Sequence, residues 1–140
     1  MSTKKKICLA VIAVAVVGII VGAVLLWKGL TPEADPIRLP AAENITEVLI
    51  ESSKEAILMG TEDGEFMVQY LREAEPTHEM SANERPDVER YYTVLIMEGE
   101  TEHRYFLYEK DGIVYVERSY EGIYTVTHLA LELARVYDNE

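Results

Sequence analysis

Residues 88–118 read VERYYTVLIMEGETEHRYFLYEKDGIVYVER. This stretch is rich in β-branched and aromatic residues, and its apolar side chains recur with the period of two that is typical of β-strands. Gly99 marks one turn, and Lys110-Asp111-Gly112 contains the Asp-Gly pair that favours a tight hairpin. We therefore predict three consecutive antiparallel strands. They are residues 88–97, 101–108 and 113–118.

The region before these strands predicts a β-β-α unit. Ile45–Glu51 and Lys54–Met59 are short segments with the composition of strands. Thr61 is predicted to cap a helix, because acidic residues that the helix dipole favours follow it directly. Pro76 ends this helix. The apolar stripe that we expect to face the core is Phe66, Met67, Tyr70, Leu71 and Ala74.

The last predicted element is an amphipathic helix, capped by Thr125 or Thr127. Its apolar positions recur at i, i+4 and i+7, at Leu129, Leu133 and Val136, and Ala130, Ala134 and Tyr137 lie beside them. The predicted order is β-β-α-β-β-β-α. The fold class is therefore α+β: an N-terminal transmembrane helix, then a small antiparallel sheet of about five strands packed with two helices.

The leader of the chain has the features of a membrane anchor. An uncharged apolar run extends from Ile7 to Trp27, and as a helix it would be about 30 Å long, the thickness of the hydrocarbon layer. Lys4, Lys5 and Lys6 precede the run, and the positive-inside rule then predicts a cytoplasmic N-terminus. We therefore expect a single-pass protein of the cell membrane with its domain outside.

Two other interpretations of the leader fit less well. A cleaved signal peptide has a shorter apolar core and a small-x-small cleavage site, whereas the apolar run continues past Val21-Gly22-Ala23. A lipoprotein has a cysteine at the end of the run, whereas Cys8 lies at its start. Pro32, Pro36 and Pro40 stiffen the segment after the run. The predicted regions are a cytoplasmic N-terminus (1–6), an anchor (7–27), a stalk (28–42) and an extracytoplasmic domain (43–140).

The charge of the domain limits its partners. The chain carries 25 acidic and 13 basic residues, a net charge of -12. Four of the lysines, Lys4, Lys5, Lys6 and Lys28, flank the leader, so the rest has nine basic and 25 acidic residues and a net charge of -16. Nucleic acid is excluded as a partner, because phosphate binding needs clustered Lys and Arg. A basic protein or peptide, or a cation, is compatible with this surface.

The segment Glu117–Tyr124 (ERSYEGIY) is the main candidate for a contact surface. It joins the last predicted strand to the last helix, and loops with charged and aromatic residues often carry function. The predicted contact residues are Arg118, Tyr120, Glu121, Gly122 and Tyr124. A structural interpretation stays open, because Gly122 can serve a tight turn. The nine tyrosines of the chain can likewise be strand residues that pack in cross-strand pairs.

Motifs for catalysis or metal binding are not found in the sequence. It has no G-x-S-x-G or S-x-x-K motif, and its one cysteine lies in the leader. His78, His103 and His128 lack the spacing of a zinc site. We therefore predict no catalytic residues, no metal and no cofactor.

Several features together resemble a family of small domains from Firmicutes that is known as domain of unknown function 5301. They are Asn44-Ile45, Glu75-Pro76-Thr77 with Ser81, Pro86, Lys110-Asp111-Gly112, and Glu117 through Tyr124 with its Tyr-x-Gly-Ile-Tyr core. The resemblance covers about Glu43 to Tyr137 and implies a membrane or lipoprotein leader, with no known activity. In the family a proline usually stands where this chain has Ser119, which implies a less rigid loop here.

These observations lead to a primary hypothesis and two alternatives. The primary hypothesis is a non-enzymatic, membrane-anchored module that binds or senses a protein or cell-wall partner outside the cell. The first alternative is an immunity or inhibitor protein, whose acidic surface blocks a basic toxin or hydrolase. The second is a cell-wall enzyme with an acid pair that has no sequence signature.

Overall fold

The structure is a computed structural model that describes residues 2–30, 35–51 and 55–138. The chain divides into two compact units, Met1–Glu33 and Ala34–Glu140. Pro32 of the predicted stalk and Lys54 of the second predicted strand lie outside the described residues. The elements are α1 (Thr3–Leu30), the 3-10 turn η1 (Ala42–Asn44), β1 (Glu47–Glu51), β2 (Ala56–Leu58), α2 (Thr61–Arg72), β3 (Glu75–Pro76), β4 (Tyr92–Glu98), β5 (Thr101–Lys110), β6 (Ile113–Arg118), β7 (Gly122–Thr125) and α3 (His128–Asp138).

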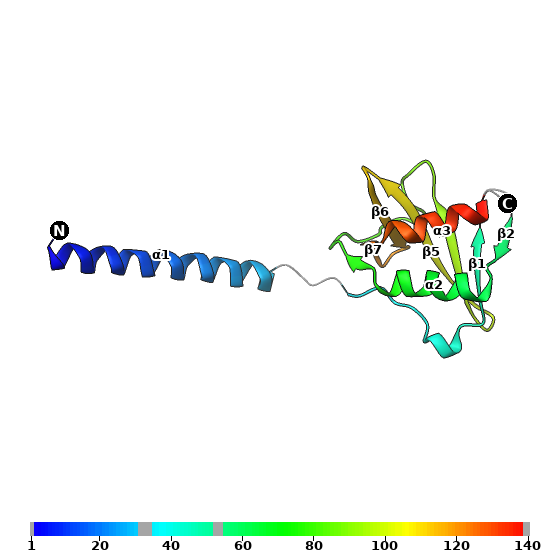
Figure 1. Ribbon diagram of the computed structural model, residues 1–140, viewed down its shortest axis with the longest axis horizontal. Coiled ribbons are helices and arrows are strands. Elements are labelled where there is room, and N and C mark those ends of the chain that lie inside the picture. The colour runs from blue at the N-terminus through cyan, green and yellow to red at the C-terminus, as the bar shows by residue number, and fades with distance from the viewer. Residues whose placement is uncertain (1, 31–34, 52–54, 139–140) are drawn as a thin grey trace. The chain divides into compact units, whose positions relative to one another are not determined.

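The first unit is dominated by the single helix α1 (Figure 1). From Thr3 to Trp27 this helix is long and apolar enough to cross a membrane. Its large apolar side chains are exposed, as expected for a helix whose partner is lipid. The helix continues to Leu30, beyond the predicted end of the anchor at Trp27.

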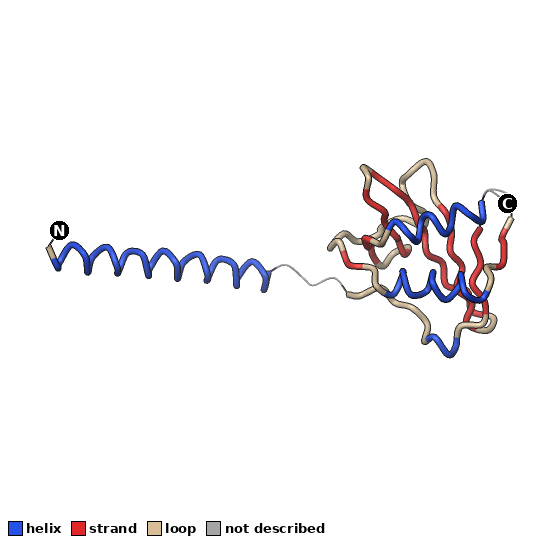
Figure 2. Tube along the Cα trace, viewed as in Figure 1, coloured by secondary structure: helices blue, strands red, loops and turns tan. Residues whose placement is uncertain are grey.

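The second unit is an α+β domain, as predicted, but its sheet has seven strands and not about five. The strand order is β2-β1-β4-β5-β6-β7-β3, and all pairs are antiparallel (Figures 1 and 2). The two strands that the sequence pattern misses are β7 and β3, which pair with each other. Both are too short for alternation to reveal, since β3 has two residues and β7 has four.

The predicted Asp-Gly hairpin is confirmed between β5 and β6. Asp111 and Gly112 have φ angles of 53° and 79°, the two positive values that a type I′ turn requires. This turn fixes the register in which Tyr108 faces Tyr115 across the two strands. Their rings stack with centroids 5.6 Å apart, so this pair of tyrosines has the packing role that strand propensity suggests.

One face of the sheet carries α2 and α3, which lie side by side on it (Figure 1). The core between these layers contains Ile50, Met67, Leu71, Ile96 and Leu107, all fully buried. A Cβ atom built on Gly64 would already lie 3.4 Å from Val48, so this glycine allows α2 to approach β1 closely.

The predicted inward stripes of both helices are confirmed in part. On α3, Ala130, Ala134 and Tyr137 are buried as predicted, but Leu129 and Val136 are about half exposed. On α2, Met67, Leu71 and Ala74 are buried as predicted, whereas Phe66 is exposed. The sequence periodicity shows that each helix has an apolar stripe. The contact between α2 and α3 decides which side chains of that stripe are buried.

The start of α2 also differs from the prediction. Gly60 is the N-cap, and Thr61 is the first residue inside the helix. Tyr137 of α3 serves this helix start, because its hydroxyl accepts the Gly60 N–H at 3.1 Å and donates to Asp63 at 2.5 Å. At α3 the prediction is confirmed for Thr127, whose Oγ1 accepts the Leu129 N–H at 3.4 Å.

The irregular segment 77–91 packs against the opposite face of the sheet at Glu117 and Phe106. Ser81 of this segment is buried, and its hydroxyl donates to the buried Glu117 carboxylate at 2.6 Å. Tyr91 packs edge-on against Phe106 with ring centroids 5.4 Å apart. The sequence of residues 77–91 is that of a polar loop. In the structure this segment packs on the sheet in the position of a third layer, without regular secondary structure.

The folded unit includes part of the predicted stalk. Ile37 is only 9% exposed and belongs to the hydrophobic core, and Pro40 is also buried. The Arg38 carbonyl accepts the Tyr105 hydroxyl at 2.6 Å, and the Pro40 carbonyl accepts Arg72 Nη2 at 3.3 Å. We refer to residues 35–41 as the strap. Because the strap packs on the core, the domain begins earlier in the chain than the predicted boundary at residue 43.

Replacement of Ile37 by alanine should destabilise the domain, because it removes core contacts that the strap supplies. We expect a loss of roughly 2–5 kcal/mol in the free energy of unfolding, measured by denaturant titration with the near-UV circular dichroism of the tyrosines. Ile113→Ala is the matched control, since Ile113 is 46% exposed and its truncation should cost less than about 1 kcal/mol. Equal effects of the two substitutions would contradict a structural strap.

Candidate functional site

The turn between β6 and β7 holds Tyr120 in an unusual backbone conformation. Its φ angle is 62°, in the left-handed region that bulky residues rarely adopt. The Glu121 N–H donates to the Arg118 carbonyl at 3.0 Å and closes the turn. The Ser119 hydroxyl donates to the Glu84 carbonyl at 2.6 Å, so Ser119 ties the turn to segment 77–91.

Arg118 is directed into the molecule. Its guanidinium lies over the Tyr105 ring, 4.7 Å from the centroid, and donates to the Arg38 carbonyl and to His103 Nδ1, each at 3.3 Å. Its Nε is 2.8 Å from a carboxylate oxygen of Glu121. Arg118 therefore joins the strap, the sheet and the turn, and most of its donor capacity is used within the domain.

Gly122 and Tyr124 form the inner wall of this site. A Cβ atom on Gly122 would lie 3.1 Å from the Tyr124 hydroxyl oxygen and 3.3 Å from Cζ, so the Tyr124 ring occupies the space that a side chain would need. Tyr124 is only 4% exposed and belongs to the core. Burial raises the pKa of Tyr124, and burial likewise raises the pKa of Tyr105 to about 12.

A second segment reaches the turn along the edge of β7. The Thr77 N–H and hydroxyl both donate to the Ile123 carbonyl, at 3.1 Å and 2.8 Å, and the Ile123 N–H donates to the Glu79 carbonyl at 3.0 Å. His78, between these bonds, also has a positive φ angle, of 68°. This pairing brings Glu79 and Met80 beside the turn.

The strap, the β7 edge and the turn together surround a pocket of about 230 Å³. We call this region the Tyr120 corner. Its lining residues are Asp35, Pro36, Arg38, Glu79, Met80, Tyr120, Glu121, Gly122, Ile123 and Tyr124. Tyr120 and Met80 are 65% and 73% exposed, so two large apolar side chains stand at the rim.

Four of the five predicted contact residues, all except Arg118, line this pocket. Tyr120 offers the largest accessible surface, Glu121 is partly exposed, and Gly122 and Tyr124 are buried in the wall. Sequence reasoning missed Asp35, Glu79 and Met80, which belong to segments far from the turn in the chain. No local sequence pattern marks such residues.

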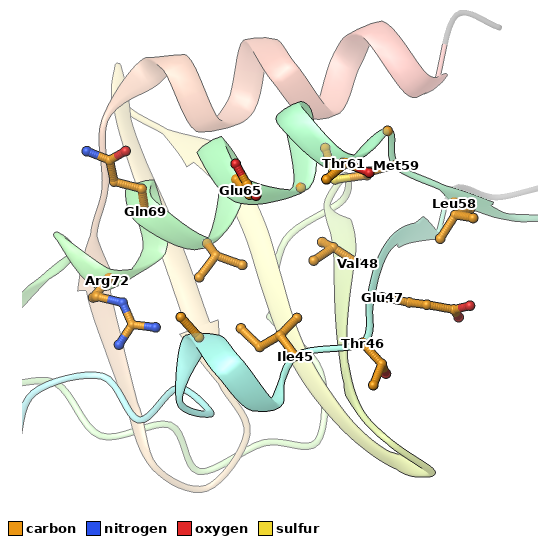
Figure 3. A pocket seen from close by; sticks show the side chains of 14 residues that line it. Ile45, Thr46, Glu47, Val48, Leu58, Met59, Thr61, Glu65, Gln69 and Arg72 are labelled. Atoms are coloured by element: carbon orange, nitrogen blue, oxygen red, sulfur yellow. The ribbon is translucent and has the colours of Figure 1, made fainter.

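A second and larger concavity lies between α2 and β1 (Figure 3). It has a volume of about 620 Å³ and shares no lining residue with the Tyr120 corner. Its lining residues are Ala42, Ile45, Thr46, Glu47, Val48, Leu58, Met59, Gly60, Thr61, Gly64, Glu65, Val68, Gln69 and Arg72. We call it the α2–β1 groove.

Within residues 2–30, 35–51 and 55–138, no group of three His, Cys, Asp or Glu side chains could hold a metal ion. The three histidines are dispersed. His103 lies under Arg118, and His128 is 3.8 Å from Glu109. The absence of a cofactor stays a prediction.

The sequence model of the family DUF5301, described as "Domain of unknown function (DUF5300)", matches residues 33–125. The chain belongs to the DUF5301 family. The match begins at residue 33, which includes the strap in the family domain, and it ends at the last residue of β7. The match therefore starts before Glu43 and stops before α3. The sequence resemblance was expected to cover Glu43 to Tyr137.

One solved structure supports the fold of this DUF5301 domain. It is described as "NMR structure of the protein from Ruminococcus gnavus" and shares 27% sequence identity with the chain. The likeness covers 64% of this chain and 89% of that one, with a TM-score of 0.54. No curated protein matches the chain.

Replacement of Gly122 by alanine should destabilise the Tyr120 corner, because the new Cβ would overlap the Tyr124 ring. We expect a loss of about 1–3 kcal/mol in the free energy of unfolding. In the Tyr124→Phe background the hydroxyl is absent, so Gly122→Ala should cost at least about 0.5 kcal/mol less, as a double-mutant cycle would measure. Strictly additive effects would show that the Tyr124 hydroxyl and a Gly122 side chain do not compete for this space.

Proposed function

We propose that this DUF5301 protein is a membrane-anchored, non-enzymatic binding module whose domain lies outside the cell and recognises a protein partner through the Tyr120 corner. The observation that carries the proposal is the conformation of Tyr120. The left-handed region costs a residue with a side chain roughly 1–2 kcal/mol. Tyr120 gains little in return from burial, because it is 65% exposed. Residues held in sparsely populated backbone conformations cluster at functional sites such as ligand clamps.

The size of the pocket favours a protein partner over a free small molecule. Pockets for small ligands usually measure about 300–1,000 Å³, and the pocket of about 230 Å³ falls below that range. It can admit one side chain of a partner, while Tyr120 and Met80 at its rim supply the surrounding contact. Tyrosine and methionine are both enriched in protein interfaces.

The charge around the corner favours a basic partner. The pocket has three acidic lining residues, Asp35, Glu79 and Glu121, and one basic lining residue, Arg38. Arg118 does not line the pocket, and its guanidinium pairs with the Glu121 carboxylate. The chain after Lys28 carries a net charge of -16. This charge would speed association with a basic protein, and the electrostatic attraction would weaken at high salt. This observation also supports the second candidate function, an immunity or inhibitor protein that blocks a basic toxin or hydrolase.

Replacement of Tyr120 by asparagine should separate binding from stability. Asparagine tolerates the left-handed conformation, so the free energy of unfolding should stay the same or rise by up to about 1 kcal/mol. Loss of the exposed ring should lower capture of the partner about tenfold. The measurement is in-cell crosslinking of the full-length protein, with mass spectrometry of the captured proteins and an anchor-only chain as background.

Val136→Ala is the matched control for this experiment, because Val136 is 54% exposed on α3 and lies outside the corner. It should leave capture unchanged. Equal capture by wild type and Tyr120→Asn would count against the corner as the binding surface. A wild-type profile identical to the anchor-only background would count against a protein partner.

The proposed orientation can be tested with single cysteines placed on either side of the anchor. In a Cys8→Ser background, Glu100→Cys in the exposed turn between β4 and β5 should react with a membrane-impermeant maleimide in intact cells. In the same background, Ser2→Cys should react only after the cells are lysed, because it precedes the lysines that we place in the cytoplasm. The reverse pattern would place the domain inside the cell.

A further inference from the structure

The turn that carries Tyr120 depends on a contact between an arginine and a histidine. Arg118 Nη2 lies 3.3 Å from His103 Nδ1. The Arg118 side chain is 18% exposed and the His103 side chain is 21% exposed. Both groups are therefore largely shielded from water and salt, so a change in the charge of one is felt strongly by the other.

The contact fixes the protonation state of the imidazole. A guanidinium group has only donors, so the nitrogen that meets it must be an acceptor. Nδ1 of His103 therefore has a free lone pair, and the single proton of the neutral ring is on Nε2. The neutral ring with its proton on Nε2 is the one form that can accept the hydrogen bond from Arg118.

Protonation of His103 would break this contact. A proton from the solvent that binds to Nδ1 removes the acceptor, and it places two cations 3.3 Å apart. Imidazole is the side chain that ordinarily changes its charge between about pH 5 and pH 8. The contact is therefore present while the ring is neutral, and it is lost as the pH falls through the titration of the ring.

A carboxylate on the other side of the ring can hold the protonated form. Glu98 Oε1 of β4 lies 3.6 Å from His103 Nε2, which is buried and has no hydrogen-bond partner among the described residues. The other charged residues that line the concavity beside His103 are Glu84 and Arg85 of segment 77–91, Glu102 and Arg104 of β5, Arg118 of β6, and Glu121 of the turn. Arg104 pairs with Glu102, and Arg118 pairs with Glu121. In the described part of the chain, Glu98 is the one carboxylate paired with the His103 ring.

Loss of the contact would loosen the turn, because the same guanidinium holds its other parts. It donates to the Arg38 carbonyl of the strap at 3.3 Å, and its Nε lies 2.8 Å from a carboxylate oxygen of Glu121. Glu121 lines the Tyr120 corner, and Tyr120 precedes it with a φ angle of 62°. A strained backbone conformation persists only where its surroundings hold it in place.

We propose that His103 is a pH-sensitive switch of the Tyr120 corner. Neutral His103 accepts the hydrogen bond from Arg118 and keeps the turn in its binding conformation. Protonated His103 pairs with Glu98, repels Arg118 and releases the turn, so partner binding weakens on acidification. This inference rests on the proposed function, because it names the condition that regulates the same surface.

The first test needs no partner and uses the full chain in nanodiscs of zwitterionic lipid, with ¹⁵N-labelled histidine. Long-range ¹H–¹⁵N NMR spectra distinguish the two nitrogens of each ring. Near pH 8, His103 should have an unprotonated Nδ1 and a proton on Nε2. As the pH is lowered to about 5, the ring should become charged, and the amide signals of Tyr120 and Glu121 should shift with the same midpoint. A proton on Nδ1 of the neutral ring, or a ring that stays neutral over this range, would overturn the proposal.

The variant His103→Asn supplies an acceptor that does not titrate, because the amide oxygen of asparagine stands at the position of Nδ1. The pH-dependent shifts of Tyr120 and Glu121 should then disappear. His128→Asn is the matched control, since His128 is exposed and pairs with Glu109 outside the corner, and it should keep the wild-type response. Shifts that persist in a folded His103→Asn protein, as they would if His78 were the titrating group, contradict the switch. The wild-type titration decides the question if the variant does not fold.

A binding experiment then connects the switch to the corner. It measures capture in cells with a photo-activated crosslinker, whose reaction does not depend on protonation, at external pH values of about 7.5 and 5.5. Capture by the wild type should fall at least about threefold at the lower pH, and capture by His103→Asn should not. Equal wild-type capture at both pH values, with capture still dependent on Tyr120, would overturn the switch and leave the proposed function intact. Capture that does not depend on Tyr120 at either pH would instead overturn the proposed function, and the regulation of binding would fall with it.

Discussion

The carbonyl oxygen of Arg38 is the point at which the parts of this domain meet. It accepts hydrogen bonds from the Tyr105 hydroxyl and from the Arg118 guanidinium, and that guanidinium also lies on the Tyr105 ring. One acceptor thereby joins the strap, the central strand β5 and the turn after β6. The backbone of the strap must stay in place for this arrangement, because Tyr105 is fully buried and its hydroxyl would otherwise lose its partner.

The strap makes residues 35–41 part of the domain. These residues were predicted to be stalk, whereas Ile37 lies in the hydrophobic core of the folded unit. The family match, which begins at residue 33, also includes this segment. The strap supplies Asp35, Pro36 and Arg38 to the wall of the Tyr120 corner, so the same residues serve both stability and the proposed site.

The two concavities illustrate how volume and charge together restrict function. The Tyr120 corner is small and has large apolar residues at its rim, which suits one side chain of a protein partner. The α2–β1 groove is larger, and its lining combines aliphatic residues with Glu47, Glu65 and Arg72.

The sequence by itself determined the apolar leader, the α+β class, the β4–β5–β6 meander and the Asp-Gly hairpin, because each depends on periodicity or on turn chemistry within a short stretch. It also singled out residues 118–124. Only the tertiary structure decided that β3 and β7 complete the sheet, that Leu131 rather than Leu129 faces the core, and that residues 35–41 belong to the domain. It alone brought Asp35, Glu79 and Tyr120 together. The physical reason is that hydrogen bonds such as Tyr105 to Arg38 and Ile123 to Glu79 join segments far apart in the chain, and local patterns carry no information about such pairs.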